Sequence, residues 1–241
     1  MIYKDISTRL EKNLPYCKFI YAGSSWAWSA FDEKNQREKI FSYADVLGKT
    51  YYDISNPGCT FKRNLIDYDL QFGYIGNSLP VIWLTTGIDS DFWQGVCEKS
   101  NWYDLWLQKQ NDYLDKIDQL NVKVLLITAH SCIVPEKKYK NITFFKDSIL
   151  DFICDISGTT KKLDDIHKRI DWDIAHGQLI YAKNPDRDLV NSVHEGLLLY
   201  EELEKKGLFS GVHPNIKSVS LFGQKYKKDI LKWVDTNYQI N

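Results

Sequence analysis

The chain has 241 residues, enough for one large domain, and its hydrophobic content of 44% with 26% charged residues is ordinary for a globular protein. Its formal net charge of -1 provides no bulk attraction to nucleic acid or to an anionic membrane. The N-terminus shows no apolar signal region, and no stretch approaches about 18 uninterrupted apolar residues, which argues against a membrane span. We therefore expect a cytoplasmic protein without nucleic-acid or membrane partners, whose 5 scattered cysteines stay reduced.

Apolar runs alternate with helical patterns in the first part of the chain, which is typical of an α/β protein. The patterns predict a strand at 18–22, a short helix at 41–47, a second strand at 50–54 and a helical segment at 61–68. A third strand is predicted at 80–86, where nearly every residue is apolar, as expected for a strand covered on both faces. We therefore expect a mostly parallel central sheet.

The next part of the chain contains an αβ unit. Apolar residues at helical spacing predict a helix over 103–120, and a strand follows at 122–128. Near the C-terminus, the same spacing predicts a final amphipathic helix that His213 opens and that continues to Trp233.

The stretch between Ser131 and Phe209 is less regular, and we interpret it as a helical insertion or lid within 131–209. Because no linker, repeat or low-complexity tract is present, we expect one domain spanning 1–241. Within this stretch, the patterns predict a short strand at 142–145 and helices at 148–156, 163–173 and 188–206.

Polar loops that contain glycine follow three of the predicted strands, at Gly23–Trp26, Asn56–Gly58 and Gly87–Asp89. In open α/β sheets, sites gather at the carboxyl ends of the strands, so we expect these loops to meet at one edge. Ser25 lies in the first loop, and His213 enters the last helix. Because a neutral hydroxyl must lose its proton to a nearby base as it attacks, this pair predicts a serine nucleophile with a histidine base.

Four short motifs in this order resemble those of the SGNH (GDSL-type) hydrolase superfamily over nearly the whole chain. They are Gly23-Ser24-Ser25, the loop Ser55–Cys59, Gly87-Ile88-Asp89 and Ser210–Asn215, which contains His213-Pro214. The resemblance implies a flavodoxin-like three-layer α/β/α sandwich with a mostly parallel central sheet. It also implies a serine-dependent ester hydrolase. Since many members remove O-acetyl groups from carbohydrates, the implied substrate is a small acyl ester or an acylated carbohydrate.

The resemblance also implies roles for single residues. Ser25 would be the nucleophile, His213 the base, and the backbone N–H groups of Ser25 and Gly58 the oxyanion donors, each typically worth roughly 3–4 kcal/mol in the transition state. Asp89 stands where the superfamily has an asparagine amide donor, and an ionised carboxylate accepts hydrogen bonds only and repels an oxyanion. Ser210 stands where an aspartate would orient His213, and its hydroxyl does not stabilise imidazolium by charge.

Several of these residues have a second interpretation. Asp89 can cap the segment that follows it, and Gly58 can be a plain turn glycine. Trp26, Trp28 and Trp93 are candidates for stacking on a sugar ring or an acyl chain, with core packing as the alternative. Asp89 and Ser210 motivate the rival hypothesis, a catalytically degenerate binding or structural module, for example a virion or assembly component.

The sequence contains no pattern for a cofactor. His130, His176 and His194 lack metal-ligand spacing, and no glycine-rich nucleotide motif is present. We therefore expect chemistry without a metal or cofactor. A carboxylate of the irregular stretch remains a candidate for orienting the base, such as Asp171, Asp173 or Asp186.

Overall fold

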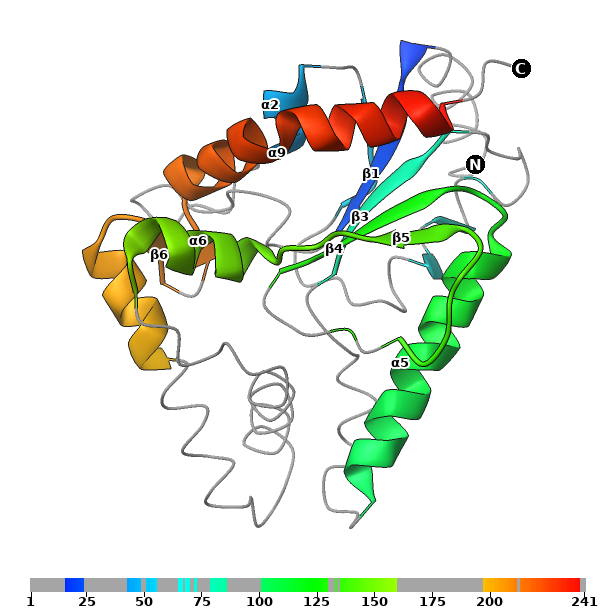
Figure 1. The fold of residues 1–241 in the computed structure, drawn as a ribbon, viewed down its shortest axis with the longest axis horizontal. Coiled ribbons are helices and arrows are strands. Elements are labelled where there is room, and N and C mark those ends of the chain that lie inside the picture. Colours follow the sequence, from blue (N-terminus) through cyan, green and yellow to red (C-terminus); the bar gives the residue numbers. More distant parts are fainter. Residues whose placement is uncertain are drawn as a thin grey trace, which may run out of the picture.

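The computed structural model describes residues 16–23, 43–48, 51–55, 65–66, 68–69, 72, 79–85, 101–129, 133, 135–159, 197–211 and 213–238. These residues form a five-stranded sheet with helices, and a separate two-stranded sheet (Figure 1). The predicted α/β class is therefore confirmed.

The central sheet has the strand order β2-β1-β3-β4-β5, and every neighbouring pair of strands is parallel. Every residue of β1 and β3 is buried, because strands inside a parallel sheet are covered on both faces. All five predicted strands are confirmed to within two residues at each end. The observed bounds are β1 (Phe19–Gly23), β2 (Tyr51–Asp53), β3 (Val81–Thr85), β4 (Val124–Thr128) and β5 (Ile142–Phe144).

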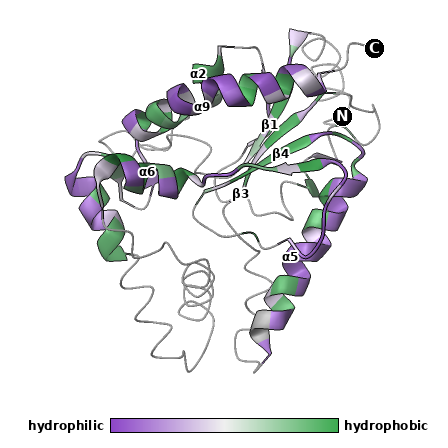
Figure 2. Ribbon diagram, viewed as in Figure 1, coloured by the Kyte–Doolittle hydropathy of each residue, from purple (hydrophilic) through white to green (hydrophobic). Residues whose placement is uncertain are grey.

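Three helices cover one face of this sheet: α2 (Tyr43–Leu47), α6 (Ile149–Ser157) and α9 (Ile216–Asn237). The strands present alternate residues to them, such as Tyr21 and Leu84. In Figure 2, α9 alternates between hydrophobic and hydrophilic segments, as expected for a helix with one face against the sheet. Its buried stripe includes Val219, Phe222, Tyr226, Ile230 and Val234.

The helix α5 (Trp102–Gln119) packs on the opposite face, where Leu114 and Ile117 are buried in the same cluster as Trp83. Residues 65–66, 68–69 and 72 are helical and contribute Leu65, Tyr68 and Phe72 to this cluster. Helices therefore cover both faces of the sheet. Within the part of the chain that the structure describes, no helix has the length and apolar character needed to cross a membrane.

The described parts of 131–209 belong to the same core as the sheet. Ile153 of α6 and Leu203 of the helical residues 197–205 are fully buried in the cluster that also contains Leu84. Residues 160–196, which include the helix predicted at 163–173, lie outside the described residues.

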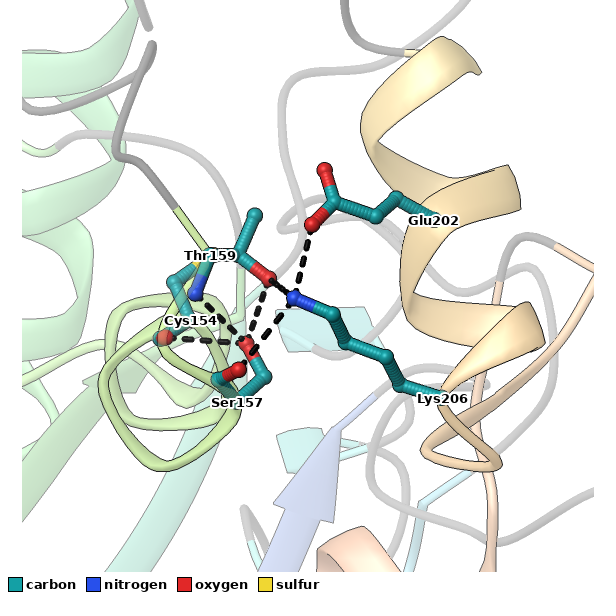
Figure 3. Close-up of polar contacts among 5 residues, drawn as sticks. All are labelled: Cys154, Ser157, Thr159, Glu202 and Lys206. Carbon is teal, nitrogen blue, oxygen red and sulfur yellow. Dashed lines mark hydrogen bonds and ion pairs between the residues drawn. The ribbon is translucent and has the colours of Figure 1, made fainter.

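A lysine ties the end of α6 to the helical residues 197–205 (Figure 3). The Lys206 Nζ donates to the Ser157 carbonyl at 3.2 Å and to the Thr159 hydroxyl at 2.9 Å, and it pairs with the Glu202 carboxylate at 2.7 Å. A cation at the carboxyl end of a helix offsets the partial negative charge of the last carbonyls. This contact joins the two chain segments that flank residues 160–196.

The last helix begins later than predicted. His213 does not open it but lies in the short strand β7 (His213–Pro214), which pairs with β6 (Phe209–Ser210). The helix starts at Ile216 because Asn215 is its N-cap: the Asn215 side chain accepts a hydrogen bond from the Ser218 N–H. The prediction that His213 opens the last helix was therefore wrong. His213 lies in the short strand that directly precedes the N-cap of α9.

Candidate active site

The carboxyl ends of β1 and β3 lie side by side in the middle of the sheet. Gly23, the last residue of β1, is in register with Leu84, the penultimate residue of β3. β1 also pairs with β2 on its other side, so the strand order reverses between β1 and β3. In open α/β sheets, ligands bind in the crevice outside such a switch point. The sequence continues from Gly23 directly to Ser24 and Ser25.

Most of the predicted site residues are not among those that the structure describes. Their predicted roles as nucleophile, oxyanion donors and stacking groups therefore stay predictions. The residues concerned are Ser25, Trp26, Trp28, Gly58, Asp89 and Trp93.

A buried hydroxyl lies at the end of β3. The Thr85 side chain is only 3% exposed, and its Oγ1 has no partner among the described parts of the chain. A buried hydroxyl without a partner costs about 1–3 kcal/mol, so such groups usually bond to a water or a ligand. Thr85 therefore places a buried hydroxyl at the carboxyl end of β3, next to the switch point.

The end of β2 is shaped by a local turn. The Asp53 Oδ1 accepts hydrogen bonds from the Ser55 N–H at 2.8 Å and from the Ser55 hydroxyl at 2.5 Å. This is an Asx turn, in which an aspartate side chain bonds to the backbone two residues later. The strand β2 ends at Asp53, so this turn lies between the strand and Asn56, the first residue of the predicted glycine loop.

His213 lies on a tight hairpin. Ser210 and His213 are register partners in the antiparallel pair of β6 with β7, so only two residues connect them. Gly211, the first of these, has a φ of 60°, a conformation that two-residue hairpin turns favour and that glycine adopts without strain. Ser210 and His213 are both half-buried. The hairpin therefore presents the histidine next to a serine rather than next to a carboxylate of the same turn.

Two connections hold this hairpin from outside. The Glu204 carboxylate accepts a hydrogen bond from the Gly211 N–H at 3.2 Å, which ties the turn to the helical residues 197–205. At the other end, the Asn215 N–H donates to the Leu208 carbonyl at 3.1 Å. His213 is thus carried by a hairpin that is fixed at its tip and at its base.

Sequence reasoning assigned no role to Asn215, Ser218 or Glu204. For Asn215 a signal existed, because asparagine before an amphipathic run is a strong N-cap candidate. The contact of Glu204 with the hairpin had no sequence signal, since it depends on how the helical residues 197–205 pack against β6 and β7.

A concave region is formed by residues other than those of the predicted site. It is a groove of about 300 Å³ on α5 and the loop before β5, lined by Asp104, Leu107, Gln108, Asn111, Asp112, Asp115, Glu136, Lys137 and Tyr139. Burial, followed by the nearby carboxylate of Asp115, raises the pKa of Tyr139 to about 12. Among the residues that the structure places, no group of three or more His, Cys, Asp or Glu side chains is arranged to hold a metal ion.

Comparisons with known proteins give no relative. No protein-family model matches the chain, and neither curated proteins nor solved structures provide a significant match.

Proposed function

We propose that this chain is a serine-dependent ester hydrolase of the SGNH type, with Ser25 as nucleophile and His213 as base. The observation that carries the proposal is the strand order β2-β1-β3-β4-β5 of a wholly parallel sheet. This is the flavodoxin-like order, in which ligands bind at the β1/β3 switch point. Helices on both faces fit the three-layer α/β/α sandwich that the proposal requires. The segment that carries Ser25 leaves β1 at this point.

The position of His213 supports its role as base. It is half-buried, and its hairpin directly precedes α9. Phe209 of the same hairpin packs in the cluster that contains Leu84 and Ala129, which lie at the carboxyl ends of β3 and β4. The proposal requires the His213 imidazole to lie at the same edge of the sheet as the nucleophile, because general-base catalysis needs the two groups within hydrogen-bond reach.

In the proposed reaction, the Ser25 Oγ attacks the carbonyl carbon of an ester while its proton passes to the His213 imidazole. The oxyanion accepts hydrogen bonds from the Ser25 and Gly58 N–H groups. The carbon–oxygen bond to the alcohol then breaks, and the alcohol leaves with the proton from His213. Water, deprotonated by His213, finally releases the acyl group as a carboxylic acid and restores the serine. The substrate class is a small acyl ester, with an O-acetylated carbohydrate as the preferred example.

A second candidate function is a binding or structural module that keeps this fold without efficient chemistry. The observation that favours it is the register of Ser210 opposite His213, because a serine there provides no charge to stabilise imidazolium. The hydrolase turns over an ester substrate and the binding module does not, so measured hydrolysis rates distinguish the two candidates.

The test compares hydrolysis of p-nitrophenyl acetate by the wild type, Ser25→Ala and His213→Ala. Ser24→Ala is the matched control, because it removes the neighbouring hydroxyl of the same loop. The proposal expects loss of turnover in Ser25→Ala and His213→Ala and retention in Ser24→Ala. If the wild type turns over no faster than the first two variants, the hydrolase proposal is wrong and the binding module is favoured.

A further inference from the structure

We propose that Asn215 is the positioning residue for His213: it fixes the base of the hairpin that carries the histidine to the first turn of α9. The proposal rests on the proposed role of His213 as the base. It concerns a residue that neither the motif pattern nor the reaction scheme assigns.

Asn215 makes hydrogen bonds through its backbone N–H and through both polar atoms of its side chain. Its backbone N–H donates to the Leu208 carbonyl at 3.1 Å, and its Nδ2 donates to the Gly207 carbonyl at 2.9 Å. Its Oδ1 accepts from the Ser218 N–H at 3.1 Å. One side chain therefore caps the helix and holds the segment that leads into β6.

Ser218 adds a second tie between the same two elements. Its side chain is fully buried, and its hydroxyl donates to the Leu208 carbonyl. The Leu208 carbonyl thus accepts from both Asn215 and Ser218, one on each side of the helix start. Because this carbonyl accepts hydrogen bonds from the N-cap and from the first turn of α9, the entry to the hairpin has little freedom to shift against the helix.

The connection from Asn215 to His213 is short and stiff. Only Pro214 separates them, and its ring fixes the backbone φ near -65°. Pro214 is buried and is in register with Phe209, which packs in the main core. With the ingoing strand held through Leu208 and the outgoing strand held through Asn215, the Cα of His213 has a defined place relative to α9.

This placement matters for a base more than for a packing residue. A displacement of about 1 Å from productive geometry can lower a rate by about a hundredfold, whereas substrate binding depends little on the position of the base. Loss of the Asn215 contact to Gly207 should therefore lower kcat and leave KM nearly unchanged.

The variant Asn215→Ser isolates this contact. Serine is as good an N-cap as asparagine, so the bond from the Ser218 N–H is replaced, but no group reaches the Gly207 carbonyl. No charge is added near the imidazole. We expect kcat for p-nitrophenyl acetate to fall about tenfold or more with KM within about twofold of the wild-type value.

Ser148→Ala is the control, because Ser148 is the N-cap of α6, with a capping box to Asp151, and is remote from the hairpin in sequence. It should destabilise the protein at least as much as Asn215→Ser while keeping kcat. If Asn215→Ser retains the kcat of Ser148→Ala, Asn215 has only a structural role and the proposal is overturned.

A second readout does not depend on hydrolysis. The ring signals of the 5 histidines can be resolved by NMR, with His213 assigned through His213→Gln. In Asn215→Ser, the His213 signal should shift or broaden and the other four should stay in place, whereas Ser148→Ala should move none of them. If the wild type shows no turnover, the proposed hydrolase function is wrong, but the positioning role of Asn215 is not. If the His213 signal does not move in Asn215→Ser, the positioning role is wrong, but the hydrolase function is not.

Discussion

Ser210 and His213 face each other across the two-residue turn of the β6–β7 hairpin, as the register pair that adjoins the turn. Residues that oppose each other in an antiparallel pair have Cβ atoms about 4.5–5.5 Å apart and share a face of the ribbon. The side chains of Ser210 and His213 therefore belong to the same face of the ribbon.

A carboxylate in place of the serine should improve the base. In Ser210→Asp, the negative charge stabilises the imidazolium that forms as His213 takes the proton, so kcat should rise about tenfold or more. Because the charged imidazole is favoured, the acid limb of the pH–rate profile should move to higher pH. Ser210→Asn is the uncharged control. Equal rates for the aspartate and asparagine variants would contradict an electrostatic role at this position.

Replacing Thr85 by valine should affect the free energy of unfolding and the hydrolytic activity in different directions. Thr85→Val keeps the shape of the side chain and removes a buried hydroxyl that has no partner among the described residues, so the free energy of unfolding should stay the same or rise by up to about 1 kcal/mol. If the hydroxyl serves a water or substrate at the switch point, kcat/KM should fall. Urea unfolding and ester hydrolysis measure the two effects. A loss of stability with unchanged kcat/KM would contradict this account.

Tyr226 should make stability depend on alkaline pH. It is buried, and its hydroxyl donates to the Asp147 carboxylate at 2.8 Å. Burial first, and this hydrogen bond second, raise the pKa of Tyr226 above its usual range. Because the folded-state pKa is raised, the contribution to stability is complete below the unfolded-state pKa of about 10 and declines as the pH rises further.

The variant Tyr226→Phe tests this expectation. At neutral pH it should lose about 1.5 kcal/mol of unfolding free energy, since a hydrogen bond to a charged group is removed. Between about pH 10 and 11, the difference between wild type and variant should narrow, because only the wild type loses this contribution. A difference that stays constant over this range would show that Tyr226 does not titrate with unfolding.

Lys206 should stabilise the contact between α6 and the helical residues 197–205. Lys206→Met keeps much of the side-chain length but removes the ammonium from the Ser157 carbonyl and the Thr159 hydroxyl, and we expect a loss of about 1 kcal/mol. Glu202→Gln removes the charge from an exposed ion pair, and the loss of that pair should cost less than about 0.5 kcal/mol. Chemical denaturation of both variants checks the order, and a larger loss in Glu202→Gln would contradict it.

The sheet was predictable from the sequence because buried parallel strands are short continuous apolar runs. Val81–Thr85 and Val124–Thr128 each stand out from the polar residues around them. Helices with a clear apolar stripe, such as α5 and α9, were predictable for the same reason.

The hairpin around His213 was not predicted. Strands of two residues have no periodicity to recognise, and β6 and β7 form only because their chain segments meet at the start of α9. As the N-cap of α9, Asn215 sets the boundary between the hairpin and the helix. Its hydrogen bond to the Gly207 carbonyl is a tertiary contact that sequence spacing does not show. The role of His213 as base stays a prediction, and the contacts that hold its hairpin were not predictable from the sequence.

Covalent labelling of the nucleophile is the most direct measurement of the central claim. The wild type, Ser24→Ala, Ser25→Ala and His213→Ala are treated with a fluorophosphonate, and the modified peptide is identified by mass spectrometry. The account predicts stoichiometric phosphonylation of Ser25 in the wild type and Ser24→Ala, none in Ser25→Ala, and much slower labelling in His213→Ala, since the base activates the hydroxyl. Absence of label in the wild type, or a label on a residue other than Ser25, would contradict it.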